Sequence, residues 1–176
     1  MVKISRLLAY IFFFILALVY FMPKESVYYY LEKKLLQEKV ILSGEDINDN
    51  GFSLELKNSS VSYDSIQSAN IEDINLKIFG IYNSLSIQNI ELSGIVSSFT
   101  PLIIDTIDVS YTIFNPLNIV ATASGEFGEA SANISILDKN ISVLLIPSDL
   151  MFKKYKSTLR NLKKNQNGEY EYDKTF

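Results

Sequence analysis

The sequence predicts a mainly β protein, in which a single N-terminal transmembrane helix is followed by a curved antiparallel β-sheet domain with a short helix near each end. Two observations support this fold class. The chain opens with an uncharged apolar run over residues 7–22. From Val40 onward, apolar residues recur at every second position over about a hundred residues, which is the period of half-buried strands.

The apolar run LLAYIFFFILALVYFM would span roughly 24 Å as a helix, which is the short end of what crosses a bilayer. Lys3 and Arg6 precede it, so the N-terminus should stay in the cytoplasm and the rest of the chain should be extracytoplasmic. A cleaved signal peptide begins in the same way, but this run is longer than the usual signal core, and no small-x-small cleavage site follows it. We therefore expect an uncleaved anchor rather than a cleaved signal or a buried core helix.

A short amphipathic helix is expected after the anchor, over residues 25–39. Pro23 suits the first turn of this helix or a kink before it. Residues at helical spacing give the helix one apolar face, namely Val27, Tyr28, Leu31 and Leu35. The three consecutive tyrosines at 28–30 suit either the lipid headgroup layer or packing against the domain.

Two strands should follow, on either side of the acidic stretch GEDINDNG, which we interpret as the turn that joins them. The alternating apolar residues of these strands are Val40 and Leu42, then Phe52, Leu54 and Leu56, with Val61 and Tyr63 continuing the pattern.

The next three strands share the pattern I-x-x-I-x-(L/V), beginning at Ile71, Ile87 and Ile104. The copies are 16 and then 17 residues apart, with Gly80 and Gly94 between them. This recurrence predicts successive strands of a meander that bury equivalent faces, although chance similarity in an isoleucine-rich sheet would look the same. Within each copy, the first Ile points away from the other two apolar residues unless a bulge intervenes.

Further strands are expected at residues 111–114, 117–123, 130–136 and 141–146, and a final strand at 169–176. Between them, Ser148 or Asp149 should cap a helix over 148–164. This helix has basic flanks and an apolar stripe formed by Met151 or Phe152, Tyr155, Leu159 and Leu162. We expect the stripe to pack on the acidic sheet, and the membrane surface is the alternative partner.

The composition of the chain excludes several classes of function. The chain has no Cys, His or Trp, which excludes disulfides and thiolate metal sites and removes the commonest catalytic base. Its net charge of -4 is unevenly spread: residues 40–150 carry fourteen acidic and three basic side chains, whereas residues 151–176 carry seven basic and three acidic ones. An acidic body argues against nucleic acid as a partner.

No motif points to chemistry, and we expect no catalytic, cofactor-binding or metal-binding residue. Residues 46–51 imitate the start of a calcium loop, but Lys57 stands where the closing Glu should be, which favours a hairpin turn. Serines lack an activating base, so an enzyme is not expected. Asn58, Asn133 and Asn140 begin glycosylation acceptor patterns, for which unmodified turn residues are the favoured reading.

One anchor precedes Pro23 and a short helix, VILSG precedes an acidic glycine turn, and SLELKNSSVSYDS precedes the repeated I-x-x-I-x-L strands. The chain closes with LLIPSDLMFKKYKSTLRNLKKNQNGEYEYDKTF. This order of parts resembles the type II secretion system protein N family and its AsmA-like relatives.

The resemblance implies a single-pass protein of the bacterial inner membrane. Residues 1–23 would form the cytoplasmic end and anchor, 24–39 a juxtamembrane helix, and 40–176 a periplasmic β domain. It further implies a non-enzymatic accessory component of an envelope-spanning secretion system, with the inner membrane and other secretion subunits as partners.

Lipid binding or transfer by the sheet is the alternative function, because AsmA-like proteins are similar to lipid bridges. About ten strands at roughly 4.8 Å give on the order of 50 Å, too little to carry a lipid between two membranes unaided. This length favours the accessory role.

Overall fold

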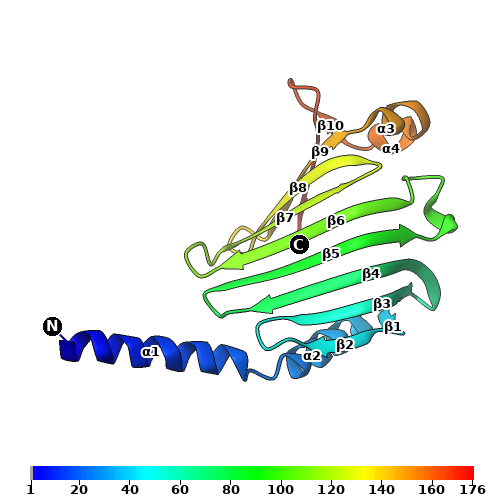
Figure 1. Cartoon of the computed structure of the whole chain (residues 1–176). Coiled ribbons are helices and arrows are strands. Elements are labelled where there is room, and N and C mark those ends of the chain that lie inside the picture. Colours follow the sequence, from blue (N-terminus) through cyan, green and yellow to red (C-terminus); the bar gives the residue numbers. More distant parts are fainter. Residues whose placement is uncertain (1) are drawn as a thin grey trace.

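The computed structural model describes residues 2–176; Met1, in the expected cytoplasmic end, lies outside them, as do the side chains of Val2 and Lys3. Two helices open the chain, α1 (Val2–Tyr20) and α2 (Lys24–Gln37), and α1 projects away from the rest of the molecule (Figure 1). Within the described residues, no helix taken alone is long and apolar enough for a membrane span. The segments Ile4–Tyr20 and Lys24–Gln37 meet those criteria together, across a bend of 48°.

The described strands form one antiparallel sheet of eleven strands, which confirms the mainly β prediction. Each strand from β3 to β8 pairs with the next in the sequence, so the predicted meander is correct. The order is β1-β3-β4-β5-β6-β7-β8-β9-β11-β10, and β2 pairs with β3 beside β1. The bounds are β1 (Val40–Ser43), β2 (Asp46–Asp49), β3 (Leu54–Tyr63), β4 (Ile66–Ile78), β5 (Tyr82–Leu92), β6 (Ile103–Thr112), β7 (Asn118–Gly125), β8 (Gly128–Ser135), β9 (Asn140–Pro147), β10 (Lys163–Lys164) and β11 (Tyr170–Thr175).

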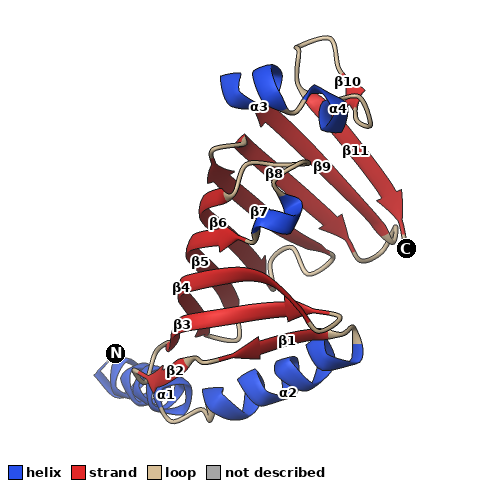
Figure 2. Cartoon of the chain, turned by 90° about the vertical axis from the view of Figure 1, so that its right-hand side faces the viewer, coloured by secondary structure: helices blue, strands red, loops and turns tan. Residues whose placement is uncertain are grey.

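The sheet is strongly curved. Figure 2 shows it as a trough that rises from α2 and β1 at the base to β9 and β11 at the top. A short 3-10 turn, η1 (Gly94–Val96), interrupts the long β5–β6 connection. The Thr158 hydroxyl, near the C-terminus, donates to the Phe99 carbonyl of that connection at 2.6 Å. The C-terminal segment is thereby fixed to one end of the strands.

The stretch GEDINDNG contains a strand, so its interpretation as a simple turn is wrong. Within it, β2 pairs with the first half of β3, whereas β1 pairs with the second half of the same strand. Gly44 separates them with a φ of 80°, a left-handed conformation that interrupts the extended backbone between the two strands. Asp and Asn are poor strand formers, which is why the pattern hid β2.

The C-terminal helix is shorter than the predicted 148–164. It forms two pieces, α3 (Asp149–Lys154) and α4 (Lys156–Leu159), separated by Tyr155 at φ -118° and ψ 32°. Ser148 is the N-cap, as expected, and its hydroxyl accepts from the Met151 N–H at 3.3 Å. Lys163 and Lys164 pair with β11 instead of continuing the helix.

The separate strand expected at 111–114 is also wrong. Tyr111 and Thr112 end β6, and residues 113–117 are the turn to β7. Pro116 explains the break, because a proline cannot donate to the ladder. The final strand predicted at 169–176 is present as β11, paired with β9.

Candidate functional site

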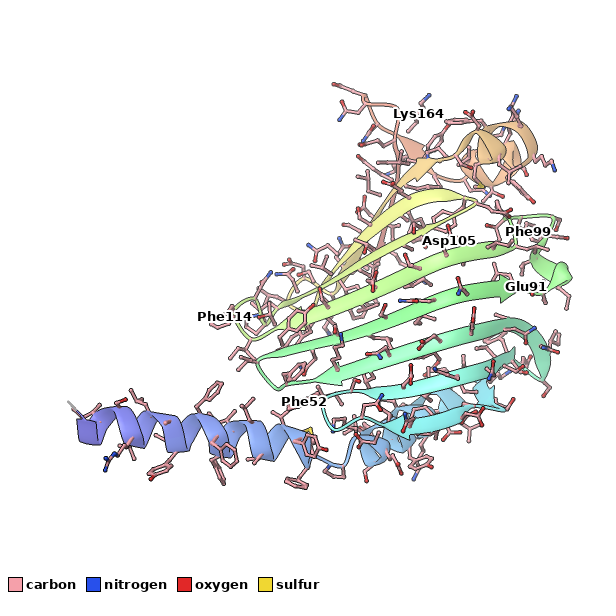
Figure 3. All side chains as sticks on the ribbon, in the orientation of Figure 1. Phe52, Glu91, Phe99, Asp105, Phe114 and Lys164 are labelled. Carbon is pink, nitrogen blue, oxygen red and sulfur yellow. The ribbon has the colours of Figure 1, made fainter. Side chains whose placement is uncertain are left out.

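The pairing register sorts the side chains of the sheet into two faces of opposite character. One face carries apolar residues along every strand from β3 to β9. The other carries mostly Ser, Thr, Asn, Asp and Glu, and Figure 3 shows it toward the viewer, with Glu91 and Asp105 labelled. The strands β9 and β11 curve away behind that polar face (Figure 1). The apolar face therefore lines the inside of the curve.

The apolar face is covered at β3–β5, which we call the closed half. Five of its side chains are almost inaccessible: Leu54, Leu56, Ile71, Ile74 and Ile90. Tyr28 of α2 belongs to the same core cluster, so α2 supplies part of the cover. Of the three tyrosines, Tyr28 thus packs on the domain, while Tyr29 and Tyr30 stay exposed.

The cover includes one buried polar contact. The Tyr28 hydroxyl donates to a carboxylate oxygen of Glu45 at 2.6 Å. Burial, and next the hydrogen bond to Glu45, raise the pKa of Tyr28 well above its ordinary value. Tyr28 is therefore held neutral as a donor that fixes α2 to the chain between β1 and β2.

The apolar face is uncovered at β7–β9, which we call the open half. Every apolar-face side chain there is only partly buried, including Ile119, Ala121, Ala123, Ala132, Val143 and Leu145. Four of the positions on β7 and β8 are alanines, at 121, 123, 130 and 132. Small side chains leave room above the sheet, and no charged residue lies among these positions.

A row of four residues explains why the first Ile of each echo lies on the same face as the second. The pairing skips Asn58, Glu72, Asn89 and Asp105, which lie at one level of β3, β4, β5 and β6. Asn58 and Asn89 have positive φ values of 56° and 52°. Each strand gains one residue here, so its alternation changes phase. We call these four residues the inflection row.

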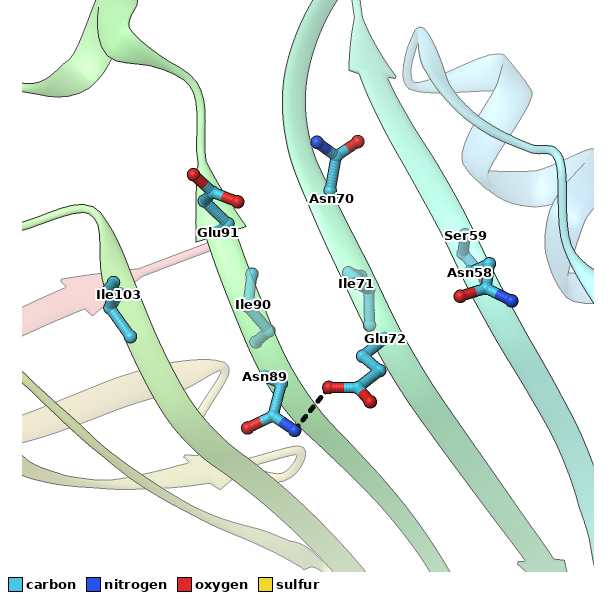
Figure 4. A pocket seen from close by; sticks show the side chains of 9 residues that line it. All are labelled: Asn58, Ser59, Asn70, Ile71, Glu72, Asn89, Ile90, Glu91 and Ile103. Atoms are coloured by element: carbon cyan, nitrogen blue, oxygen red, sulfur yellow. Dashed lines mark hydrogen bonds between the residues drawn. The ribbon is translucent and has the colours of Figure 1, made fainter.

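Three residues of the inflection row, Asn58, Glu72 and Asn89, line a hollow of about 480 Å³ whose walls are formed by both polar and apolar side chains (Figure 4). Glu72 and Glu91 are its carboxylates, and Asn89 donates an N–H to Glu72 at 2.6 Å. Within residues 2–176, no group of three or more Asp, Glu, Cys or His side chains could hold a metal ion. We assign the hollow to the irregular backbone rather than to a ligand.

Of the calcium-like segment, residues 46–49 form β2, while Asn50 and Gly51 lie in the hairpin turn to β3; the three acceptor asparagines lie in strands. Asp49, in the calcium-like segment, accepts from Lys24, and Asp46 pairs across the ladder with Lys57. Asn133 lies on the outer face of β8. The Asn140 amide donates to the Ser142 hydroxyl at 3.0 Å.

The junction of α1 and α2 is held by a fully buried lysine. The Lys24 ammonium donates to the Tyr20 and Met22 carbonyls at 3.4 and 3.3 Å and forms an ion pair with Asp49 at 3.2 Å. It therefore caps the C-terminal end of α1, where a cation is favourable. No sequence pattern marked Lys24, because its role depends on β2.

The basic C-terminal segment packs on the domain through part of its stripe. Met151 and Leu159 are buried, while Phe152 is exposed. None of the ion pairs in the described chain involves a cation of residues 151–176. Lys156, Arg160 and Lys164 instead surround an apolar hollow of about 470 Å³.

Comparisons with protein-family models, with curated proteins and with solved structures give no match to this chain.

Proposed function

We propose that this chain is a non-enzymatic protein, anchored in the bacterial inner membrane by α1, whose periplasmic sheet holds lipid acyl chains against its open half. The observation that carries the proposal is the uncovered apolar surface of β7–β9. Contiguous apolar surface that stays accessible on a folded domain marks an interaction site, and the side chains of the open half are only partly buried. Acyl chains need no polar partner, so they suit a face made of Ala, Val, Ile and Leu.

The surface of α1 supports the anchoring. Its large apolar side chains are extensively exposed, from 37% for Leu16 to 73% for Phe13. In water this exposure is unfavourable, whereas in hydrocarbon it is the normal condition of a helix. Tyr20 and Phe21 at its end suit the headgroup layer, where aromatic residues gather.

The size of the sheet supports an accessory role. Ten strands at about 4.8 Å reach on the order of 50 Å, so a lipid held here must pass to another protein to travel further. A component of an envelope-spanning assembly, which the family resemblance implies, fits this requirement. The binding of secretion subunits to the same face is the competing function.

Photo-crosslinking separates the two functions. A photoreactive amino acid is placed at Ala121, Ala132 or Val143 on the open half of the full chain in native membranes. Matched controls place it one residue away on the polar face, at Thr122, Ser131 and Ser142. We expect lipid adducts, identified by mass spectrometry, from the first set alone. Protein adducts without lipid at these positions would instead support binding of a secretion subunit.

A further inference from the structure

A second apolar surface lies at one end of the strands, apart from the open half. Because the sheet is a meander, alternate connections fall at the same end. Four of them, at residues 50–53, 79–81, 113–117 and 136–139, we call the anchor-side turns. Their most exposed large apolar side chains are Phe114 at 85%, Leu137 at 70% and Ile81 at 57%.

The anchor-side turns carry almost no charge. Asp138 and Lys139 are their only ionisable side chains, and these two cancel. At the opposite end, the connections carry Glu38, Lys39, Asp64 and Glu126, together with the lysines of α3 and α4. Residues 93–102 are the uncharged exception there. The two ends of the sheet therefore differ in polarity.

The helix α1 leaves the domain from the end with the anchor-side turns. The Tyr20 ring meets Phe52 edge-on at 5.4 Å between centroids, and Phe52 stacks on Phe79 at 6.3 Å. Gly51 permits this contact, because the Tyr20 ring fills the space that a Cβ at Gly51 would need. Figure 3 shows Phe52 and Phe114 on the α1 side and Phe99 on the other.

We infer that the anchor-side turns insert into the headgroup layer of the membrane that holds α1, so that the sheet stands on the lipid surface at its strand ends. Aromatic and aliphatic side chains that project from a surface favour this layer. The near absence of charge means that insertion does not depend on anionic lipid. The inference rests on the anchoring proposed for α1, but not on acyl chain binding by the open half.

Labels at single positions test the inference, since the chain has no cysteine of its own. Three full-length variants, Phe114→Cys, Leu137→Cys and Glu126→Cys, are labelled with a polarity-sensitive fluorophore and reconstituted into phosphatidylcholine vesicles. Flotation of the vesicles first reports whether α1 anchors the chain. We expect blue-shifted emission from labels at 114 and 137, with most of it lost to lipids that carry a quencher. The label at 126 should stay unquenched.

The results distinguish the two proposals. A chain that fails to float contradicts the anchoring, and the inference falls with it. A chain that floats while labels at 114 and 137 remain as aqueous as the label at 126 overturns the inference alone. Insertion that requires phosphatidylglycerol would also overturn it, because uncharged turns gain nothing from anionic lipid. Circular dichroism of each variant confirms that the sheet is intact.

Discussion

The closed and open halves of the apolar face have the same alternation but different packing. In the closed half, Leu54 and Leu56 are completely buried, and α2 contributes Tyr28 to the same cluster. In the open half, alanines occupy four of the apolar-face positions on β7 and β8, and none of the apolar-face positions is fully buried. The closed half therefore works as the core that stabilises the fold, while the open half is stable without a cover and remains available for binding.

The largest expected effect is in the closed half. Ile90→Asp places an unpaired carboxylate where the side chain is 5% exposed. The loss of apolar burial and the desolvation of the charge should together lower the free energy of unfolding by about 4 kcal/mol or more. Urea unfolding of the full chain in mild detergent, followed by circular dichroism, measures the change. Ser84→Asp is the control, because it faces the polar side opposite Lys77. Equal stability of the two variants would contradict a common buried face.

The next largest effect concerns the position of α2 over the closed half. Lys24→Met removes the ion pair with Asp49 and the cap on α1. Leaving the partly buried Asp49 carboxylate unpaired should cost about 1–3 kcal/mol. Lys39→Met, which removes an exposed ion pair with Asp64, should cost less than about 1 kcal/mol. If the two substitutions lower the free energy of unfolding equally, Lys24 does not hold α2 over the closed half.

A smaller effect is expected from the hydrogen bond within the cover. Tyr28→Phe should lower the free energy of unfolding by about 1 kcal/mol at neutral pH. The pKa of Tyr28 is higher in the folded protein than in the unfolded chain. Above about pH 10 the unfolded chain therefore loses the phenolic proton while the folded protein keeps it. The contribution of Tyr28 to the free energy of unfolding falls as the pH rises. The stability difference between the natural protein and Tyr28→Phe should therefore fall by about 1.4 kcal/mol between pH 9 and pH 11, which is enough to cancel or reverse it. A constant difference over that range would show that the tyrosine is not held neutral.

The smallest effect on stability is expected in the open half. Ala132→Asp adds a charge to a partly exposed position, so the free energy of unfolding should change by less than about 1 kcal/mol. Lipid recovered with the purified protein should nevertheless fall strongly, while Ser131→Asp on the polar face should leave it unchanged. A large loss of stability for Ala132→Asp would mean that the open half is part of the core.

The alternation of apolar residues was sufficient to predict most strands, because the register of a half-buried strand follows from its buried face. It could not predict which parts of that face are covered, since Tyr28 reaches the sheet from a helix outside it. Residue size held a usable signal: large residues at 54, 56, 71, 74 and 90 differ from the alanines of β7 and β8.

The missed features share one physical cause, which is backbone that departs from regular geometry. Asn58 and Asn89 adopt positive φ in the middle of strands. Regular structure is also interrupted at Gly44, between β1 and β2, and at Tyr155, between α3 and α4. Asn is one of the few residues that tolerates this conformation, so an Asn inside an apolar alternation was a signal for the inflection row. The ion pair of Lys24 had no such signal, because Asp49 is 25 residues away.

The inflection row also limits how this sheet can change in evolution. The phase change occurs at the same level in β3, β4, β5 and β6, so neighbouring strands remain matched. Deleting the extra residue from one strand would turn half of its apolar side chains outward, while the strands paired with it stay unaltered. A mutation at Asn58 or Asn89 should thus be strongly epistatic, tolerated only when the adjacent strands change with it. The row thereby constrains four successive strands to change together.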